Sequence, residues 1–129
     1  MTKPPTSTKG GRKTQLPRVQ VLFGAVFPLG PGKAALIEAV GKTGSISAAA
    51  REMGMSYRRA WTLIAAANKC FKKPLVDTAT GGRGGGGAVV TDTGYEVLKR
   101  YRDIEQKAVQ AVTTEVKDLS KFLAPETTE

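Results

Sequence analysis

The sequence predicts a mainly helical fold with a small amount of β structure, and three observations point to it. Apolar residues recur at helical spacing on both sides of Gly54. A glycine-rich run, residues 81–87, lies between two short β-prone segments. A third apolar pattern, with a period close to 3.6 residues, begins after Thr91. We therefore predict a winged helix-turn-helix with an N-terminal β-hairpin and a long C-terminal dimerisation helix.

Composition narrows the function classes. The chain has 129 residues, the size of one domain with tails. It has no histidine and one cysteine, Cys70, which excludes His-based triads and leaves no basis for Cys/His metal clusters. The three carboxylates of the first 87 residues, Glu38, Glu52 and Asp77, are most simply surface charges. We therefore expect no enzyme activity, no cofactor and no bound metal. The lone thiol fits a cytoplasmic location, although a secreted protein without disulfides would have the same cysteine count.

Charge is distributed unevenly along the chain. The formal net charge is +9, but residues 1–87 hold 14 lysines and arginines against three carboxylates, whereas residues 88–129 hold six against eight. The first part is therefore strongly basic and the second slightly acidic. Such asymmetry is typical of a polyanion-binding half joined to a half with another task, and nucleic acid is the commonest polyanion. An anionic membrane surface fits the charge alone, but we expect no membrane partner.

The chain is predicted to divide into four segments. Residues 1–17 are rich in Pro, Gly, Ser, Thr and Lys/Arg and form a disordered basic arm, since they have too few apolar groups to offset chain entropy. Residues 18–91 form the winged helix-turn-helix, 92–123 the dimerisation helix and 124–129 a disordered tail. A signal peptide is the competing interpretation of the N-terminus. Gln20, Pro28 and the lack of a clear cleavage site argue against it.

The first folded elements are a hairpin and a helix. Val19, Val21 and Phe23 alternate with their neighbours before Gly24 and Ala25, which suit a tight type II′ turn. A helix is then predicted from Pro31 to a stop at Gly44, with apolar residues on one face. The GPGK run at 30–33 is not a phosphate loop, because it lacks the loop's first glycine and its Ser/Thr.

The stretch SISAAAREMGMSYRRAW, residues 45–61, is typical of a helix, a tight turn and a second helix. Ser45 or Ser47 can cap the first helix, Gly54 supplies a positive φ, and Ser56 caps a helix that runs to about Phe71. Two helices that cross steeply at such a turn need small residues at the elbow, although an ordinary corner of two helices would have the same spacing. The predicted elbow and shared core are Ala49, Ala50, Met53, Met55, Ala60 and Leu63.

The second helix of this pair has a slim basic face. On a helical wheel Arg58, Thr62 and Lys69 lie opposite the apolar residues, with Tyr57, Arg59 and Trp61 on the flanks. Arginine on guanine is the commonest specific major-groove contact, and it usually comes from the first turns of such a helix. The alternative is a solvated basic face, with Tyr57 and Trp61 as half-buried packing residues. The predicted DNA contacts on the helix pair are Ser47, Ser56, Tyr57, Arg58, Arg59, Thr62 and Lys69.

The run PLVDTATGGRGGGGAVVT, residues 74–91, predicts a strand, a glycine loop and a returning strand. Glycines at the tip allow close approach to a phosphate chain, and Arg83, followed by Gly84, is suited to a minor groove. Arg83 and Gly84 are therefore further predicted DNA contacts. A loop whose arginine contacts only water is the alternative.

From Thr91, a capping candidate, the pattern indicates a helix of about 30 residues and about 45 Å. A domain of this size cannot cover so long an apolar stripe, so we expect a second copy to cover it in a homodimer. A tail that folds back or frays is the alternative. The predicted interface comprises Val97, Tyr101, Ile104, Ala108, Val112, Val116 and Leu119.

Three motifs, GSISAAAREMGMSYRRAW, the following NKCFxxPLV and TGGRGGGGAVVTDTG, together resemble the DNA-binding half of ModE-type molybdate-responsive transcriptional regulators. The resemblance spans roughly residues 18–108. It implies a winged helix-turn-helix that dimerises through its long helix and binds a palindromic operator. Carried over to this chain, it makes residues 56–59 and Thr62 the base and phosphate readers, and Arg83 the wing contact.

Family members continue into barrel domains that bind molybdate or tungstate, and we expect these to be lacking here because the sequence ends at Glu129. A separate oxyanion-sensing protein is then a candidate partner. The predicted function is a cytoplasmic, bacterial, homodimeric, sequence-specific transcriptional regulator on double-stranded DNA, in control of genes for molybdenum or a related metal oxyanion. The alternative is an architectural DNA-binding protein with little sequence preference.

Overall fold

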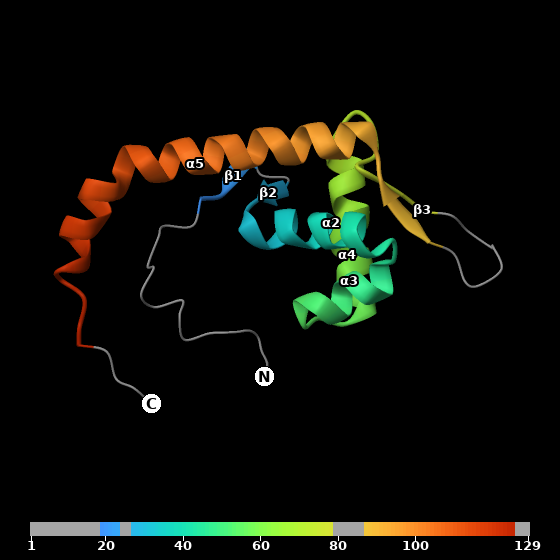
Figure 1. Cartoon of the computed structure of the whole chain (residues 1–129), viewed down its shortest axis with the longest axis horizontal. Coiled ribbons are helices and arrows are strands. Elements are labelled where there is room, and N and C mark those ends of the chain that lie inside the picture. Colours follow the sequence, from blue (N-terminus) through green and yellow to red (C-terminus); the bar gives the residue numbers. More distant parts are fainter. Residues whose placement is uncertain (1–18, 24–26, 79–86, 126–129) are drawn as a thin grey trace.

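The computed structural model describes residues 19–23, 27–78 and 87–125, and shows a helical domain with two small hairpins (Figure 1). Helices α2, α3 and α4 are grouped together, and α5 runs along one side of the group. This arrangement confirms the predicted fold class. In chain order the elements are β1 (Val21–Phe23), β2 (Phe27–Leu29), α2 (Pro31–Thr43), α3 (Ile46–Met53), α4 (Tyr57–Cys70), β3 (Val76–Thr78), β4 (Ala88–Val90) and α5 (Asp92–Ser120).

Strands β1 and β2 form the predicted N-terminal hairpin. They are antiparallel, with Val21 opposite Leu29 and Phe23 opposite Phe27. The predicted Gly24-Ala25 turn itself lies outside the described residues.

Local capping chemistry sets the limits of the helices. Pro31 opens α2, where its fixed φ suits the first turn, and Gly44 ends it with a φ of 73°. The hydroxyl of Ser45 accepts a hydrogen bond from the Ala48 amide, so Ser45 rather than Ser47 caps α3. Gly54 then turns the chain with a φ of 69°. The helix-turn-helix boundaries predicted from the sequence are therefore confirmed.

The core lies between α2, the helix pair and the first half of α5. Ala49, Ala50 and Ala60 are each at most 2% exposed, which is the close approach that small residues at the elbow permit. Met53, Met55 and Leu63 are partly buried against this core. The largest fully buried side chains are Tyr101, Leu36, Ile37, Leu75, Val40 and Val76.

Strands β3 and β4 form a second antiparallel hairpin, with Val76 opposite Val90. This is the predicted wing. The predicted contacts Arg83 and Gly84 lie between the strands, in residues 79–86, outside the described part of the chain.

Helix α5 has 29 residues, which corresponds to about 44 Å. Its N-cap is Thr91, whose hydroxyl accepts a hydrogen bond from the Gly94 amide at 2.9 Å. Near its C-terminal end the helix changes direction (Figure 1). Thr113 donates a hydrogen bond from its hydroxyl to the Val109 carbonyl oxygen at 2.6 Å, the kind of contact that bends helices.

The two ends of α5 have different surroundings, and this corrects one interface prediction. Tyr101 is 1% exposed, and its hydroxyl donates a hydrogen bond to the Val19 carbonyl oxygen at 2.5 Å. It is therefore a core residue of its own chain and is not available to a partner. Val97 is partly buried against the same core. Among the predicted interface residues, the exposed ones begin further along, at Ile104.

Candidate nucleic-acid interface

The outward face of α4 places Arg58, Thr62 and Lys69 in solvent. The side chain of Arg58 makes no hydrogen bond or ion pair among residues 19–23, 27–78 and 87–125, so its guanidinium remains available for an external acceptor. Thr62 donates its hydroxyl proton to the Arg58 carbonyl oxygen at 2.9 Å. That hydroxyl oxygen can still accept a hydrogen bond from a ligand.

Two aromatic rings flank this face. Tyr57 is 53% exposed and Trp61 is 50% exposed. One part of each ring packs on the domain and the rest is exposed. This half-burial fits both a contact with a groove wall and the predicted alternative of half-buried packing.

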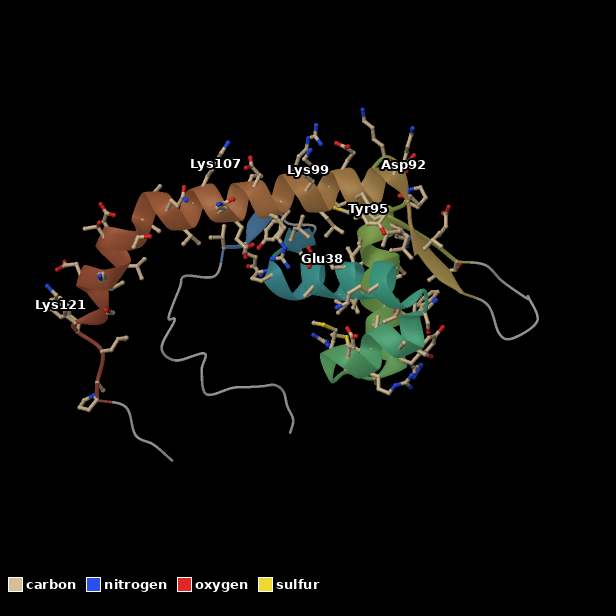
Figure 2. All side chains as sticks on the ribbon, in the orientation of Figure 1. Glu38, Asp92, Tyr95, Lys99, Lys107 and Lys121 are labelled. Carbon is tan, nitrogen blue, oxygen red and sulfur yellow. The ribbon has the colours of Figure 1, made fainter. Side chains whose placement is uncertain are left out.

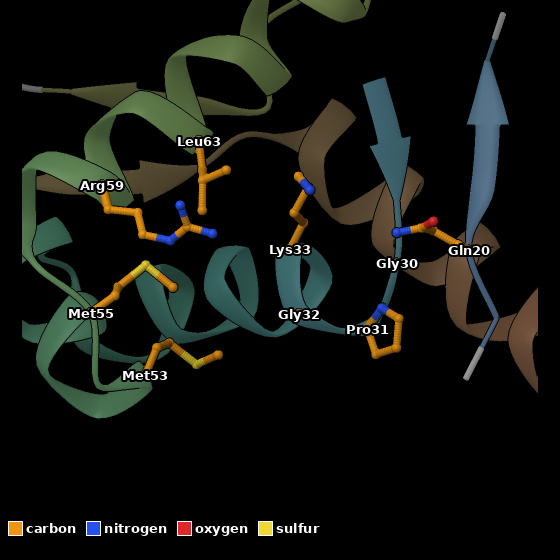
Figure 3. Close-up of a pocket in the computed structure, with 9 residues that line it drawn as sticks. All are labelled: Gln20, Gly30, Pro31, Gly32, Lys33, Met53, Met55, Arg59 and Leu63. Carbon is orange, nitrogen blue, oxygen red and sulfur yellow. The ribbon is translucent and has the colours of Figure 1, made fainter. Parts of the chain in front are cut away.

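Arg59 points in a different direction from Arg58. Its side chain lies beside Met55 and Leu63 and extends toward Lys33 of α2 (Figure 3). Arg59 is exposed, but it lines a cavity on one side of α4. Of the two neighbouring arginines, Arg58 is therefore the one that projects from the outward face.

Two predicted serines lie at the N-termini of the helix pair, and both are exposed. Ser56 accepts a hydrogen bond from the Arg59 amide at 3.1 Å, and therefore already works as the N-cap of α4. Ser47 is in the first turn of α3 and does not cap it. Helix N-termini carry partial positive charge and unpaired amides, which favour phosphate contacts.

Asn68, which was not among the predicted site residues, holds the wing against α4. Its side-chain oxygen accepts hydrogen bonds from the amides of Leu75, at 2.8 Å, and Val76, at 3.1 Å. Its side-chain nitrogen donates to the Val76 carbonyl oxygen at 2.9 Å. One residue of α4 thus fixes the start of β3. A polar asparagine among the alanines of this helix is the sequence signal for such a role.

Further hydrogen bonds attach the wing to the rest of the domain. The Ala88 amide donates to the Gly44 carbonyl oxygen at 3.0 Å, and the Thr91 amide donates to that of Leu75 at 2.9 Å. Gly94 packs so closely on this corner that an added Cβ would overlap the Leu75 carbonyl oxygen. The wing is therefore held at both strands in a fixed position relative to α4.

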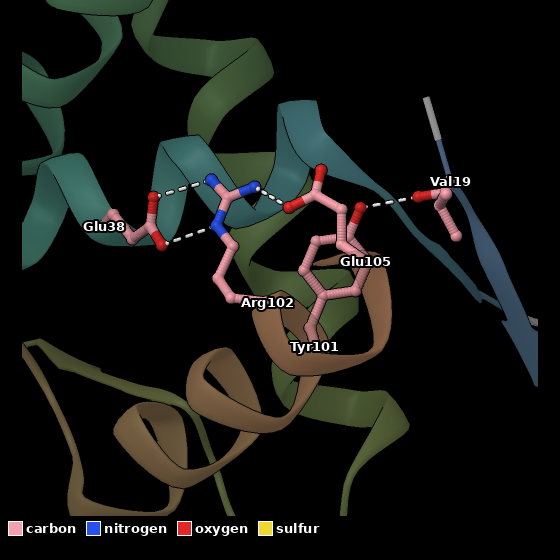
Figure 4. A network of polar contacts seen from close by, with 5 residues as sticks. All are labelled: Val19, Glu38, Tyr101, Arg102 and Glu105. Atoms are coloured by element: carbon pink, nitrogen blue, oxygen red, sulfur yellow. Dashed lines mark hydrogen bonds and ion pairs between the residues drawn. The ribbon is translucent and has the colours of Figure 1, made fainter. Parts of the chain in front are cut away.

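An ion-pair cluster joins α5 to α2 (Figure 4). Arg102 binds Glu38 through two contacts, Nη2 to Oε1 at 2.8 Å and Nε to Oε2 at 3.0 Å, and its Nη1 contacts Glu105 Oε1 at 2.8 Å. The hydrogen bonds to Glu38 raise the pKa of Arg102 above its ordinary value, against the lowering effect of burial, and Glu105 adds to the rise. Glu38, predicted to be a surface charge, thus positions the long helix.

The outer side of α5 is charged. Lys99 and Lys107 extend from the side that faces away from the helix group (Figure 2).

Among the described residues, no three His, Cys, Asp or Glu side chains are grouped so as to hold a metal ion. No helix of the described chain is long and apolar enough to cross a bilayer.

Comparisons with known proteins agree with this geometry. Residues 33–95 match the family described as "Bacterial regulatory helix-turn-helix protein, lysR family". The chain is 39% identical over 115 residues to the molybdenum-pterin-binding protein MopB of Rhodobacter capsulatus, which covers 89% of this chain and 43% of MopB. It is 38% identical over 86 residues to the DNA-binding transcriptional dual regulator ModE of Escherichia coli K12, covering 64% of this chain and 33% of ModE. The chain is thus similar to the DNA-binding regulator ModE and carries a region that matches a bacterial regulatory helix-turn-helix family.

Within the matched region, α3 and α4 are the helix pair and β3 with β4 is the wing. The chain spans less than half the length of MopB and about a third of that of ModE. The family match runs from α2 to the first turn of α5. It therefore contains the helix pair and both wing strands, the elements that Asn68 and Thr91 tie together.

Proposed function

We propose that the protein is a sequence-specific DNA-binding transcriptional regulator that acts as a homodimer on a palindromic operator. The observation that carries this proposal is the exposed Arg58 and Thr62 face of α4, on the second helix of a ModE-type helix pair. The names of MopB and ModE support a role in the control of genes for molybdenum or a related metal oxyanion. Double-stranded DNA is the partner, the cytoplasm is the location, and no enzymatic step is required.

In the proposed complex α4 enters the major groove. Arg58 donates two hydrogen bonds to one guanine, and Thr62, one turn further along, contacts the adjacent base. Tyr57 and Trp61 contact the groove walls. The phosphate contacts come from Ser47, Ser56, Arg59, Lys69 and the glycine tip of the wing at Gly84, while Arg83 follows the minor groove.

The homodimer is proposed to form through the part of α5 from Ile104 onward. Ile104 is 45% exposed, Val112 38% and Leu119 66%, and Phe122 and Leu123 beyond the helix are 83% and 66% exposed. Ala108 and Val116 are half-buried on the same stripe. Apolar surface of this extent is stabilised when a second copy covers it. Val97 supports the stripe from inside its own domain. A separate oxyanion-sensing protein would complete the regulatory system.

The test of sequence reading is selection from a pool of random duplexes. Repeated binding and recovery should enrich one motif with two-fold symmetry, in two half-sites about one helical turn apart. In competition at physiological salt, the selected duplex should bind about 10³-fold or more tightly than a scrambled one. An architectural protein would give no enriched motif and similar affinity for both duplexes, with a steep dependence on salt.

The test of the dimer is sedimentation equilibrium of the full chain. A homodimer should be present at working concentrations, and substitution of an uncovered stripe residue should shift the equilibrium to monomer. A wild-type chain that remains monomeric at those concentrations contradicts the proposed assembly.

A further inference from the structure

A cavity of about 420 Å³ lies beside α4, between that helix, the start of α2 and the turn between α3 and α4 (Figure 3). It is separate from the outward face that presents Arg58. Its lining side chains come from three parts of the chain that are distant in sequence. They include the side chains of Gln20, Lys33, Met53, Met55, Arg59 and Leu63.

The polar side chains of the cavity favour an anion. Arg59 extends from α4 and Lys33 from α2, so two cationic groups border the same space (Figure 3). No carboxylate is among the described residues that line it. Arg59 has no ion pair or side-chain hydrogen bond within the described chain, so its guanidinium keeps its full capacity to bind a carboxylate or phosphate. Gln20 adds an amide at the rim.

The remaining walls are apolar. Met53 and Met55 lie on one side and Leu63 on another, and methionine adapts its shape to irregular ligands. The volume falls within the range of small-molecule sites and exceeds what a bare oxyanion would fill. From the paired cations, the apolar walls and this volume, we propose that the cavity binds a small organic anion with one phosphate or carboxylate group and an apolar body.

Arg59 belongs to the helix that is proposed to enter DNA, so a ligand in the cavity would draw on a group that also serves a DNA phosphate. Ligand and DNA then weaken each other's binding by the same factor, as linkage requires. This regulatory step rests on the proposed function. The ligand site itself does not rest on it. Arg59 and Lys33 would bind the phosphate group of a free ligand whether or not the chain also binds the phosphates of DNA.

The test uses the methionine methyl groups as reporters. The chain has three methionines, and two of them line the cavity. Carbon-13 labelling of the methyl groups gives three NMR signals, which Met53→Leu and Met55→Leu assign. Titration with phenyl phosphate should shift the two cavity signals with saturation at or below about 1 mM and leave the Met1 signal unchanged. No saturable shift of either cavity signal overturns the proposal.

Matched variants test the role of the two cations in the cavity, and matched probes test the chemical class of the ligand. Arg59→Gln and Lys33→Gln should each weaken phenyl phosphate binding about 10-fold or more, whereas Lys42→Gln, an exposed lysine of α2 outside the cavity, should not. Benzyl alcohol, which is neutral, and inorganic phosphate, which has no apolar body, should both bind at least about 10-fold more weakly. If either probe binds as tightly as phenyl phosphate, or if both cavity variants bind phenyl phosphate as tightly as the wild type does, the cavity is not an organic anion site.

A final experiment tests the competition between ligand and DNA separately from ligand binding in the cavity. A scrambled duplex added to the phenyl phosphate complex should return the methionine signals toward their free positions. Failure of that displacement overturns the link to DNA and leaves the ligand site supported. Arg58→Gln, outside the cavity, should keep full phenyl phosphate binding, so loss of DNA binding in that variant tests the proposed function alone.

Discussion

Replacement of Asn68 by alanine is expected to loosen the wing and to cost measurable stability. The change removes three hydrogen bonds, of 2.8, 2.9 and 3.1 Å, between α4 and the start of β3. Leu75 is 0% exposed and Val76 is 2% exposed, so their amides would lose a partner where water has little access. A buried donor without a partner costs about 1 to 3 kcal/mol.

The magnitude follows from these contacts. Two buried amides share the Asn68 oxygen, and partial rehydration reduces their combined cost to about 2 to 4 kcal/mol. Alanine is the better helix former and returns about 0.7 kcal/mol. We therefore expect a net loss of about 1 to 3 kcal/mol, a sizeable share of the roughly 5 to 15 kcal/mol that is usual for a domain.

The assay is urea unfolding followed by the fluorescence of Trp61, the one tryptophan of the chain. With a slope of about 2 kcal/mol per molar urea, the midpoint should fall by about 0.5 to 1.5 M. Lys69→Ala, at the exposed neighbouring position, should stay within about 0.5 kcal/mol of the wild type. If Asn68→Ala is equally mild, the three hydrogen bonds do not hold the wing.

Three other predictions concern packing, DNA and assembly. Gly94→Ala should lower the free energy of unfolding by about 1 to 3 kcal/mol, because its Cβ would overlap the Leu75 carbonyl oxygen, whereas Gly32→Ala, with open space around it, should be neutral or stabilising in the same urea assay. Lys69→Ala should lower the affinity for the selected and the scrambled duplex alike in a binding titration, and it should reduce the slope of log affinity against log salt concentration by about 1. A loss of affinity confined to the selected duplex would contradict a phosphate role. Leu119→Glu should shift sedimentation toward monomer, and an unchanged dimer would place the interface elsewhere.

Local features were predictable because their physical causes lie within a few residues. The caps at Ser56 and Thr91 and the left-handed turn at Gly54 depend on side chains and backbone amides that are neighbours in sequence. The faces of α4 followed from helical periodicity in the same way. Ala60 and Ile64 are buried, and Arg58 is exposed.

Other features depend on contacts between distant residues, which periodicity does not contain. The apolar repeat of α5 includes Tyr101, but only the position of Val19, 82 residues earlier, makes that tyrosine a core residue. Glu38 and Arg102 are 64 residues apart, and neither motif nor spacing connects them. One stripe on a helix can therefore change from core to surface along its length, and the sequence alone does not show where.

The central claim is that Arg58 reads a base from the exposed face of α4. The most direct measurement is the ratio of dissociation constants for the scrambled and the selected duplex, taken side by side for the wild type and Arg58→Ala. The wild type should prefer the selected duplex by about 10³-fold or more, and the variant should lose about 1 to 3 kcal/mol on that duplex, with relaxed preference at one base pair. A variant that loses the same affinity on both duplexes would show that Arg58 contacts only the phosphate backbone.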